Sequence, residues 1–216
     1  MTATQRLLRA LFHFLYHQAA PAYDAVAAFV SLGLWLDWTR ASLPFVYGDR
    51  VLELGSGPGH LQAELRAKLA GVFGLDESPQ MIRIARRRLL AAGIRSLNLV
   101  RAAAGSLPFS TGSFHCIVAT FPSAYIVERS TLAEARRVLG AGGRLVLLPM
   151  AWHTGRGPLG RLMAWLFRVT GESAGSFEAI SALLRRSFEE AGFSVDVQHV
   201  TVRTAEVLLL VATKPG

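Results

Sequence analysis

The spacing of apolar residues in the first part of the chain predicts helices. Between Gln5 and His17 the apolar side chains fall on one arc of a helical wheel, at about 100° per residue, and the arginines and histidines fall on the other. Pro21 ends this pattern, and a second helical segment is predicted from about Tyr23 toward Trp38. The first helix must lie across an apolar surface, which is the protein's own core or a bilayer interface.

From Val51 the pattern changes to short apolar runs that alternate with helical segments. The predicted strands are Val51–Leu54, Val72–Asp76, Leu97–Val100, Phe114–Thr120 and the run GGRLVLLP, which begins at the Gly142-Gly143 turn. The predicted helices are Leu61–Leu69, Pro79–Ala92 with Ser78 as its cap, and Thr131–Leu139. This alternation predicts a mostly parallel sheet with helices on both faces.

The end of the chain follows a different pattern. A helix is predicted over Phe177–Ala191, and the runs Ser194–Val202 and Glu206–Thr213 follow with a very short connection between them. So short a connection joins antiparallel strands. The chain contains no internal repeat, low-complexity tract or long linker, so we expect a single domain over residues 1–216.

Composition narrows the class of protein. The 216 residues are 51% apolar, which is enough for one sizeable core, and the net charge of +8 indicates a polyanion or an anionic membrane surface as a partner. The single Cys116 lies in an apolar run, which excludes a disulfide framework and suits a reducing cytoplasm. The apolar run Ala25–Leu36 is too short to span a bilayer, and His13 and His17 interrupt the apolar patch that a cleavable signal peptide needs.

The stretch VLELGSGPGH, from Val51 to His60, indicates a binding site. A parallel strand that enters a helix through a glycine-rich turn directs backbone N–H groups and a helix N-terminus at one point. The dinucleotide pattern G-x-G-x-x-G needs its third glycine at position 60, whereas this chain has it one residue earlier, at Gly59. Glu53 precedes the turn, and its carboxylate suits a cationic ligand better than a pyrophosphate.

At this turn the sequence resembles the first motif of class I S-adenosylmethionine-dependent methyltransferases, E/D-x-G-x-G-x-G. GLDESPQMI resembles the second motif, AAAGSLPFSTGSFHCIV the third and fourth, and EARRVLGAGGRLVLL the following helix and fifth strand. The likeness is greatest to the subfamily that includes ubiquinone and menaquinone biosynthesis methyltransferases and small bacterial phospholipid N-methyltransferases. It implies an α/β, Rossmann-like sheet of seven strands, mostly parallel with a C-terminal antiparallel strand and helices on both faces.

The resemblance also assigns roles in binding S-adenosylmethionine. Asp76 would accept hydrogen bonds from the ribose hydroxyls, and Met81 would pack against the adenine or belong to the core. Ala103 stands where the family has an acid for the adenine amino group, and His115 replaces another common acid. The full set of cofactor-binding residues that the resemblance predicts is Tyr16, Tyr23, Glu53, Gly55, Ser56, Gly57, Gly59, Asp76, Glu77, Met81, Ala104, Gly105, Ser106 and Thr120.

Residues after the fourth and fifth strands are expected to face the crevice at the carboxyl edge of the sheet. Among them, His153 is the preferred candidate for a general base, because imidazole titrates near neutral pH. The alternative is that His153 is an exposed loop residue. Tyr125 is the second catalytic candidate. Methyl transfer from a sulfonium is an in-line displacement, so a base is optional.

Within the single domain the sequence predicts four parts. These are an N-terminal helical cap over 1–45, a cofactor-binding core over 46–150, a lid or interfacial insertion over 151–176, and a C-terminal helix with an antiparallel strand pair over 177–216. The insertion contains RLMAWLFRV, in which arginines alternate with tryptophan and leucine. Such a helix lies at a bilayer interface, closes over an oily substrate, or packs in the core.

These features together predict transfer of a methyl group from S-adenosylmethionine to a small hydrophobic or lipid-like acceptor, either a phospholipid amine headgroup or a quinone-type or other aromatic hydroxyl. TFPSAY lacks the Asn/Asp-Pro-Pro-Tyr signature, which argues against nucleic acid as substrate. A non-catalytic cofactor-binding or membrane-surface adaptor and a nicotinamide dehydrogenase are the alternatives. We expect a cytoplasmic monomer or homodimer without a metal, whose basic helices at 5–17 and 158–169 either contact the inner membrane surface or pack in the core.

Overall fold

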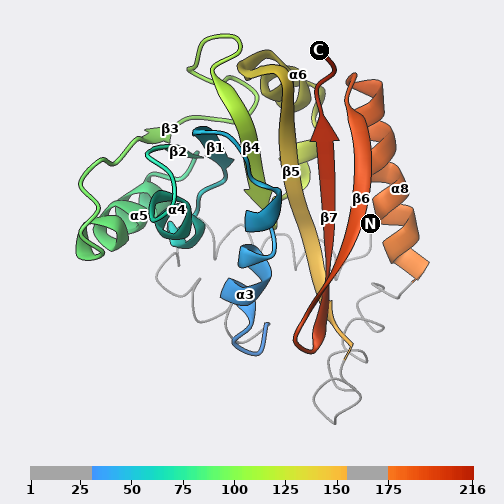
Figure 1. The fold of residues 1–216 in the computed structure, drawn as a ribbon, viewed down its shortest axis with the longest axis horizontal. Helices are drawn as coiled ribbons and strands as arrows, with labels where there is room; N and C mark the ends of the chain where they lie inside the picture. Colours follow the sequence, from blue (N-terminus) through green and yellow to red (C-terminus); the bar gives the residue numbers. More distant parts are fainter. Residues whose placement is uncertain (1–30, 155–174) are drawn as a thin grey trace, which may run out of the picture.

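The computed structural model describes residues 31–154 and 175–216, which contain one seven-stranded sheet in the order β3-β2-β1-β4-β5-β7-β6 (Figure 1). The strands are β1 Arg50–Leu54, β2 Gly71–Asp76, β3 Leu99–Arg101, β4 Phe114–Thr120, β5 Leu139–His153, β6 Ser194–Val202 and β7 Ala205–Thr213. The helices are α3 Trp35–Arg40, α4 His60–Arg66, α5 Pro79–Ala91, α6 Arg129–Val138 and α8 Gly175–Glu190, with short 3-10 turns at Leu43–Phe45 and Ala124–Val127.

The pairing of the strands confirms the predicted class of fold. Strands β1 to β5 pair in parallel, and β7 runs antiparallel between β5 and β6. The carboxyl ends of the five parallel strands therefore meet at one edge of the sheet, which is the edge where ligands bind in open α/β folds.

Two apolar cores lie on opposite faces of the sheet. Side chains alternate along each strand, so Val51 packs toward α3 and α4, whereas Leu52 packs toward α6 and α8. Helix α5 lies beside α4 and packs against β2 and β3. The sheet is thus covered on both faces, as the near-continuous apolar strands require.

The predicted cap of α5 is confirmed. The Ser78 hydroxyl accepts a hydrogen bond from the Met81 N–H at 3.3 Å, and Pro79 occupies the first helical position. The predicted C-terminal hairpin is also confirmed, since β6 and β7 form a continuous antiparallel ladder.

Two predictions about the elements are wrong. The helical segment expected from Tyr23 toward Trp38 does not run continuously, because Leu32 and Gly33 have φ angles of 53° and 81° and α3 begins after them. The fifth strand extends past the predicted run at both ends, from Leu139 to His153, with a register shift between Leu147 and Met150. The predicted helix over 5–17 and most of the predicted insertion lie outside the described residues.

Within residues 31–154 and 175–216, no helix is long and apolar enough to cross a membrane. The same residues contain no cluster of three or more potential metal ligands. Cys116 is buried in β4.

Candidate functional site

The glycine turn between β1 and α4 is shaped by left-handed backbone conformations. Gly55, Gly57 and Gly59 have φ angles of 69°, 51° and 83°, which side chains with a Cβ rarely adopt. A Cβ at Gly55 would lie 2.7 Å from the Tyr125 hydroxyl, and one at Gly59 would lie 2.9 Å from the Cβ of Ala85. At Gly57, by contrast, the nearest atom would be a backbone oxygen at 3.9 Å, so the turn leaves open space there.

Asp76, at the end of β2, is hydrogen-bonded to this turn. Its Oδ2 accepts the Gly57 N–H at 2.8 Å, and its Oδ1 accepts the Ser78 N–H at 2.8 Å. The turn is further anchored by the Ser56 N–H, which donates to the Leu75 carbonyl at 2.9 Å. Because each carboxylate oxygen can accept a second hydrogen bond, Asp76 can also accept from a ligand hydroxyl.

Glu53 lies in β1 just before the turn and is only 2% exposed. Burial raises its pKa to about 8, and the charge of Asp76 adds to this, whereas a hydrogen bond from Gln62 Nε2 at 2.7 Å and the charge of Arg66 oppose it. Glu53 is therefore largely protonated near neutral pH. A cationic ligand beside it would favour loss of that proton.

A narrow cleft opens at the carboxyl edge above the turn. It is lined by Trp35, Thr39, Glu53, Gly55, Ser56, Gly57, Pro58, His60, Leu61 and Thr120. Five of the predicted cofactor residues thus lie together in this lining. Within the described residues the Ser56 hydroxyl oxygen is buried without a hydrogen-bond partner. An unpartnered buried hydroxyl beside an acid and open backbone suits a ligand that carries both charge and hydrogen-bonding groups.

Other predicted cofactor residues do not line this cleft. Met81 is completely buried in α5, and Glu77 is exposed. Ala104, Gly105 and Ser106 follow β3 in a loop that packs near the start of α6. Tyr16 and Tyr23 lie outside the described residues. The roles of all these residues stay predictions.

Of the two catalytic candidates, Tyr125 lies nearer to the glycine turn. Its hydroxyl donates a long hydrogen bond, 3.5 Å, to the Leu54 carbonyl at the end of β1. The same hydroxyl lies next to Gly55, whose lack of a Cβ allows this approach. A phenol at this place can reach a ligand that is bound at the turn.

His153 is placed differently from the expected loop position. It is the last residue of β5 and pairs with Ala205 of β7. Its ring packs on Trp38 at a centroid distance of 5.2 Å. Burial lowers the pKa of His153, and a backbone hydrogen bond with Ser31 opposes that effect. His153 does not belong to the lining of the cleft, so a role as the base stays a prediction.

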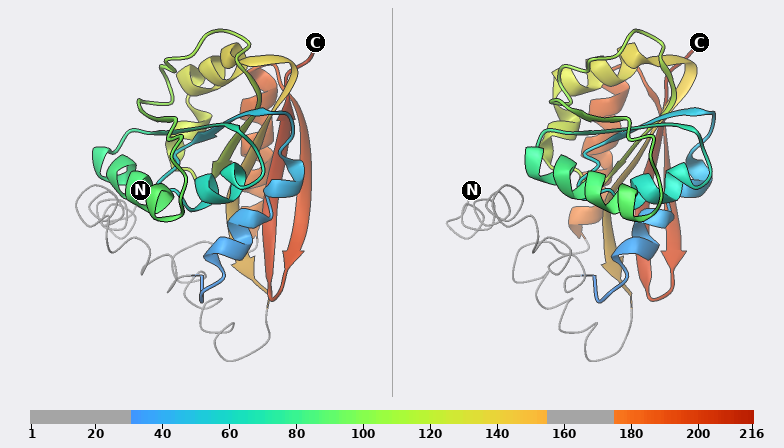
Figure 2. Two further views of the ribbon diagram at one scale, coloured as in Figure 1. Left: turned by 60° about the vertical axis from the view of Figure 1, so that its left-hand side comes forward. Right: turned by 90° about the vertical axis from the view of Figure 1, so that its left-hand side faces the viewer.

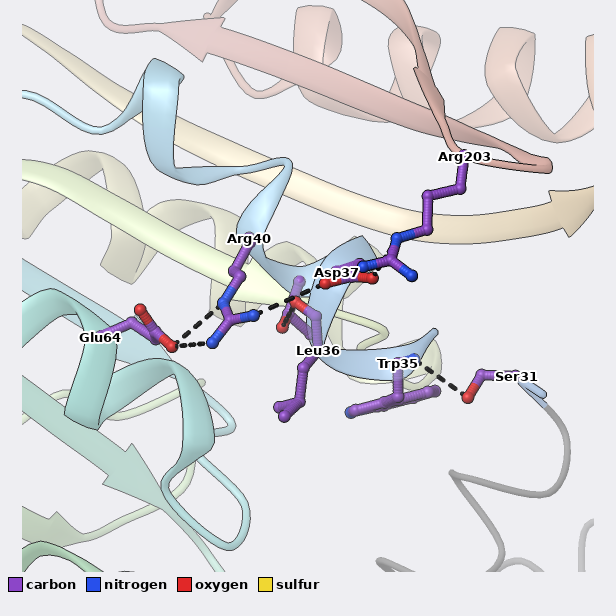
Figure 3. Close-up of polar contacts among 8 residues, drawn as sticks. Ser31, Trp35, Leu36, Asp37, Arg40, Glu64 and Arg203 are labelled. Carbon is purple, nitrogen blue, oxygen red and sulfur yellow. Dashed lines mark hydrogen bonds and ion pairs between the residues drawn. The ribbon is translucent and has the colours of Figure 1, made fainter. Parts of the chain in front are cut away.

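The sequence reasoning predicted a helix up to Trp38 but missed that α3 forms one wall of the cleft. Figure 3 shows how ion pairs fix this helix. Arg40 Nε donates to Glu64 of α4 at 3.0 Å, and Arg203, in the turn between β6 and β7, lies 2.8 Å from Asp37. These exposed ion pairs join α3 to α4 and to the β6–β7 turn, and the buried Trp38 packs the same helix onto the sheet. A single continuous helix was expected there, so this arrangement was not predicted. The two tryptophans of the WLDW sequence could have indicated an aromatic surface at this place.

An aromatic pair borders the cleft. Trp35 stacks on Phe121, which follows β4, with ring centroids 4.2 Å apart and an interplanar angle of 28°. Trp38 also lies near Phe121, with ring centroids 6.2 Å apart. Planar apolar surfaces beside a polar turn can accommodate a flat, hydrophobic ligand.

Of the two departures from the family pattern, His115 lies far from the carboxyl edge, whereas Ala103 follows Ala102, whose N–H donates to the Asp76 carbonyl at 3.3 Å. His115, near the start of β4, contacts Asp49 at 2.9 Å on the surface, at the opposite end of the strand from Thr120. Ala103 is exposed in the loop after β3. The histidine is therefore a surface residue outside the site.

Comparisons with known proteins agree with this geometry. Residues 51–143 match the family described as "Methyltransferase domain". The chain is 30% identical to the demethylmenaquinone methyltransferase of Thermus thermophilus over 89% of this chain and 97% of that protein. It is 36% identical to the enzyme of the same name from Clavibacter sepedonicus, over 62% of this chain and 55% of that protein.

A similar solved structure is the phosphoethanolamine N-methyltransferase 2 of Haemonchus contortus, in complex with phosphomonomethylethanolamine and S-adenosylhomocysteine. The TM-score is 0.62 and the identity 14%, over 90% of this chain and 58% of that chain. At this identity the likeness concerns the fold.

The sheet order, the glycine turn and the acid at the end of β2 define a Rossmann-like nucleotide site. With the relatives above, the chain belongs to the class I S-adenosylmethionine-dependent methyltransferases. It is an enzyme, and S-adenosylmethionine is its methyl donor. This finding excludes the nicotinamide dehydrogenase and favours catalysis over the adaptor role.

Proposed function

We propose that the enzyme methylates a small, flat, hydrophobic acceptor of the quinone type. The observation that supports this most is the match to the Thermus thermophilus demethylmenaquinone methyltransferase over almost the whole of that protein. The stacked Trp35 and Phe121 beside the cleft support a planar acceptor. A phospholipid amine is the competing acceptor, which the positive charge of the chain favours.

The cofactor supplies an electrophilic methyl group on a sulfonium centre. In our proposal the glycine turn and Ser56 bind the methionine end of the cofactor, and the Asp76 carboxylate accepts hydrogen bonds from the ribose hydroxyls. Glu53 loses its proton when the cation binds, because the positive charge stabilises the carboxylate that burial alone disfavours. These residues orient the methyl group, and the closely packed walls exclude water.

On the acceptor side, we propose that Tyr125 hydrogen-bonds an acceptor hydroxyl and so aligns the attacking atom. Its hydroxyl already lies at the glycine turn, close to Gly55. His153 is the weaker candidate for the base, because its ring packs on Trp38, whereas the Tyr125 hydroxyl contacts the glycine turn. Neither side chain is part of the cleft lining.

The test is a transfer assay with cofactor labelled in the methyl group. The purified chain is incubated in parallel with a reduced demethylated naphthoquinone and with phosphatidylethanolamine vesicles, and the label is followed into the lipid extract. We expect label in the quinone product and none in phospholipid. Label in the phospholipid alone would refute the quinone proposal and establish the competing acceptor. Asp76→Ala serves as the control for cofactor-dependent transfer.

A further inference from the structure

A long stretch of the chain carries positive charge without any acid. Between positions 78 and 127 there is no Asp or Glu, and the same stretch contains six arginines. Four of the six lie in α5. Neither the glycine turn nor the proposed acceptor site accounts for this accumulation of charge.

The two faces of helix α5 differ in residue type and burial. Its inner side is apolar and buried, at Met81, Ala85 and Leu89. Its outer side, which we name the α5 arginine face, consists of the exposed Arg83, Arg86, Arg87 and Leu90. These four positions span an arc of about 100° at the helical repeat. Arg88 is turned inward and donates to the Pro58 carbonyl.

The charges of this face have no described counterpart. Elsewhere Arg40, Arg137 and Arg186 pair with glutamates. Among the described residues, no ion pair involves Arg83, Arg86 or Arg87. Arginines three and four residues apart repel one another and destabilise a helix. The face therefore retains a concentrated positive charge, which an external anion can neutralise.

The α5 arginine face lies on a helix that begins close to the glycine turn. Helix α5 begins three residues after Asp76, at the carboxyl edge where the glycine turn opens. Figure 2 shows α5 on the side of the molecule that faces the viewer in the right-hand image. An anionic surface bound to α5 would lie beside the edge at which ligands enter.

We propose that the α5 arginine face docks the enzyme on a bilayer that contains anionic phospholipids. The arginines bind the headgroups, and Leu90, which is 46% exposed among them, enters the boundary with the acyl chains. This combination favours lipid over nucleic acid, because α5 carries an apolar residue on this face and has no aromatic side chain on which a base can stack.

The test uses the full chain and vesicles of phosphatidylcholine with and without phosphatidylglycerol, separated by sedimentation. The variant R83Q/R86Q/R87Q removes the three charges. Its partition onto the anionic vesicles should fall about 100-fold, since each arginine at an anionic surface contributes about 1 kcal/mol. Binding of the wild type should weaken as salt is added.

The matched control removes the same number of charges from the other face of the sheet, with R129Q/R136Q/R185Q in α6 and α8, whose residues are exposed. Partition of this control should fall less than tenfold. Equal losses in both variants, or an unchanged partition of the α5 variant, overturn the proposal. So does an α5 variant that loses binding to heparin or RNA but keeps its vesicle binding.

Vesicle binding requires no methyl acceptor, so the outcome is independent of the proposed quinone substrate. Both variants should keep the circular dichroism of the wild type and its affinity for S-adenosylhomocysteine. If the α5 variant retains these and still leaves the vesicles, the loss reports docking and not unfolding.

Discussion

Replacing Glu53 by glutamine measures how much the ionisation of this buried carboxyl group lowers the free energy of unfolding. Burial raises the pKa of Glu53 to about 8, whereas a glutamate in an unfolded chain titrates near about 4.3. Between these values the folded protein holds a proton that the unfolded chain has lost. The folded state is therefore favoured at the lower pH, and its stability falls as pH rises through this window.

The size of the effect follows from the two pKa values. At pH 5.5 the folded carboxyl group lies about 2.5 pH units below its pKa, and each unit corresponds to about 1.4 kcal/mol. Glu53 is still partly protonated at pH 8.5, and the unfolded chain holds a small fraction of the proton at pH 5.5, so both contributions are subtracted. The free energy of unfolding of the wild type then falls by about 3 kcal/mol between pH 5.5 and 8.5. Glutamine keeps the shape and an acceptor for Gln62 but has no proton to lose.

The assay is urea unfolding of wild type and Glu53→Gln at several pH values from 5.5 to 8.5. All other titrations cancel in the difference between the two free energies of unfolding, which should shift by about 3 kcal/mol in favour of the variant. Glu189→Gln, at an exposed position of α8, provides a control whose difference should stay flat. A flat difference for Glu53→Gln would refute the raised pKa and the reasoning built on it.

Three further predictions concern the site. Asp76→Ala should weaken S-adenosylhomocysteine binding at least about tenfold in calorimetry, because hydrogen bonds to a charged group contribute about 1.5–3 kcal/mol; retained affinity contradicts the ribose role. Gly59→Ala should lower the free energy of unfolding by about 1–3 kcal/mol more than Gly93→Ala, because the Cβ added at Gly59 meets Ala85 of α5. Gly93 is the matched control, since it has a similar φ but open space around it. Equal losses in the two variants would exclude the clash. Tyr125→Phe should lower kcat about tenfold at unchanged cofactor affinity, and His153→Gln less than threefold; the reverse order would make His153 the base.

The sequence was sufficient for the elements that position the cofactor site. Apolar runs predicted Phe114–Thr120 and Ser194–Val202 with the bounds that the structure has. The glycine spacing and the acid at position 76 predicted a turn, and the structure joins them by the hydrogen bond from Gly57 to Asp76. Such features are local, because left-handed backbone and helix caps depend on residues close in sequence.

What the sequence did not predict depends on contacts between distant segments. The wall formed by Trp35 and Thr39 depends on ion pairs with Glu64 and Arg203, which no periodicity reveals. His153 was expected in a loop because the apolar run ends before it, yet pairing with β7 extends the strand. Tertiary pairing there overrides the local preference.

The ion pair between Arg203 and Asp37 has a consequence for how this enzyme can change. The terminal hairpin contributes no residue to the described cleft lining, yet it holds the helix that carries Trp35. If Trp35 contacts the acceptor, as we propose, substitutions at the hairpin tip would change which acceptors fit without altering any residue of the proposed cofactor site. On this proposal, natural or laboratory selection could change the choice of acceptor through Arg203, which lies outside the described cleft lining.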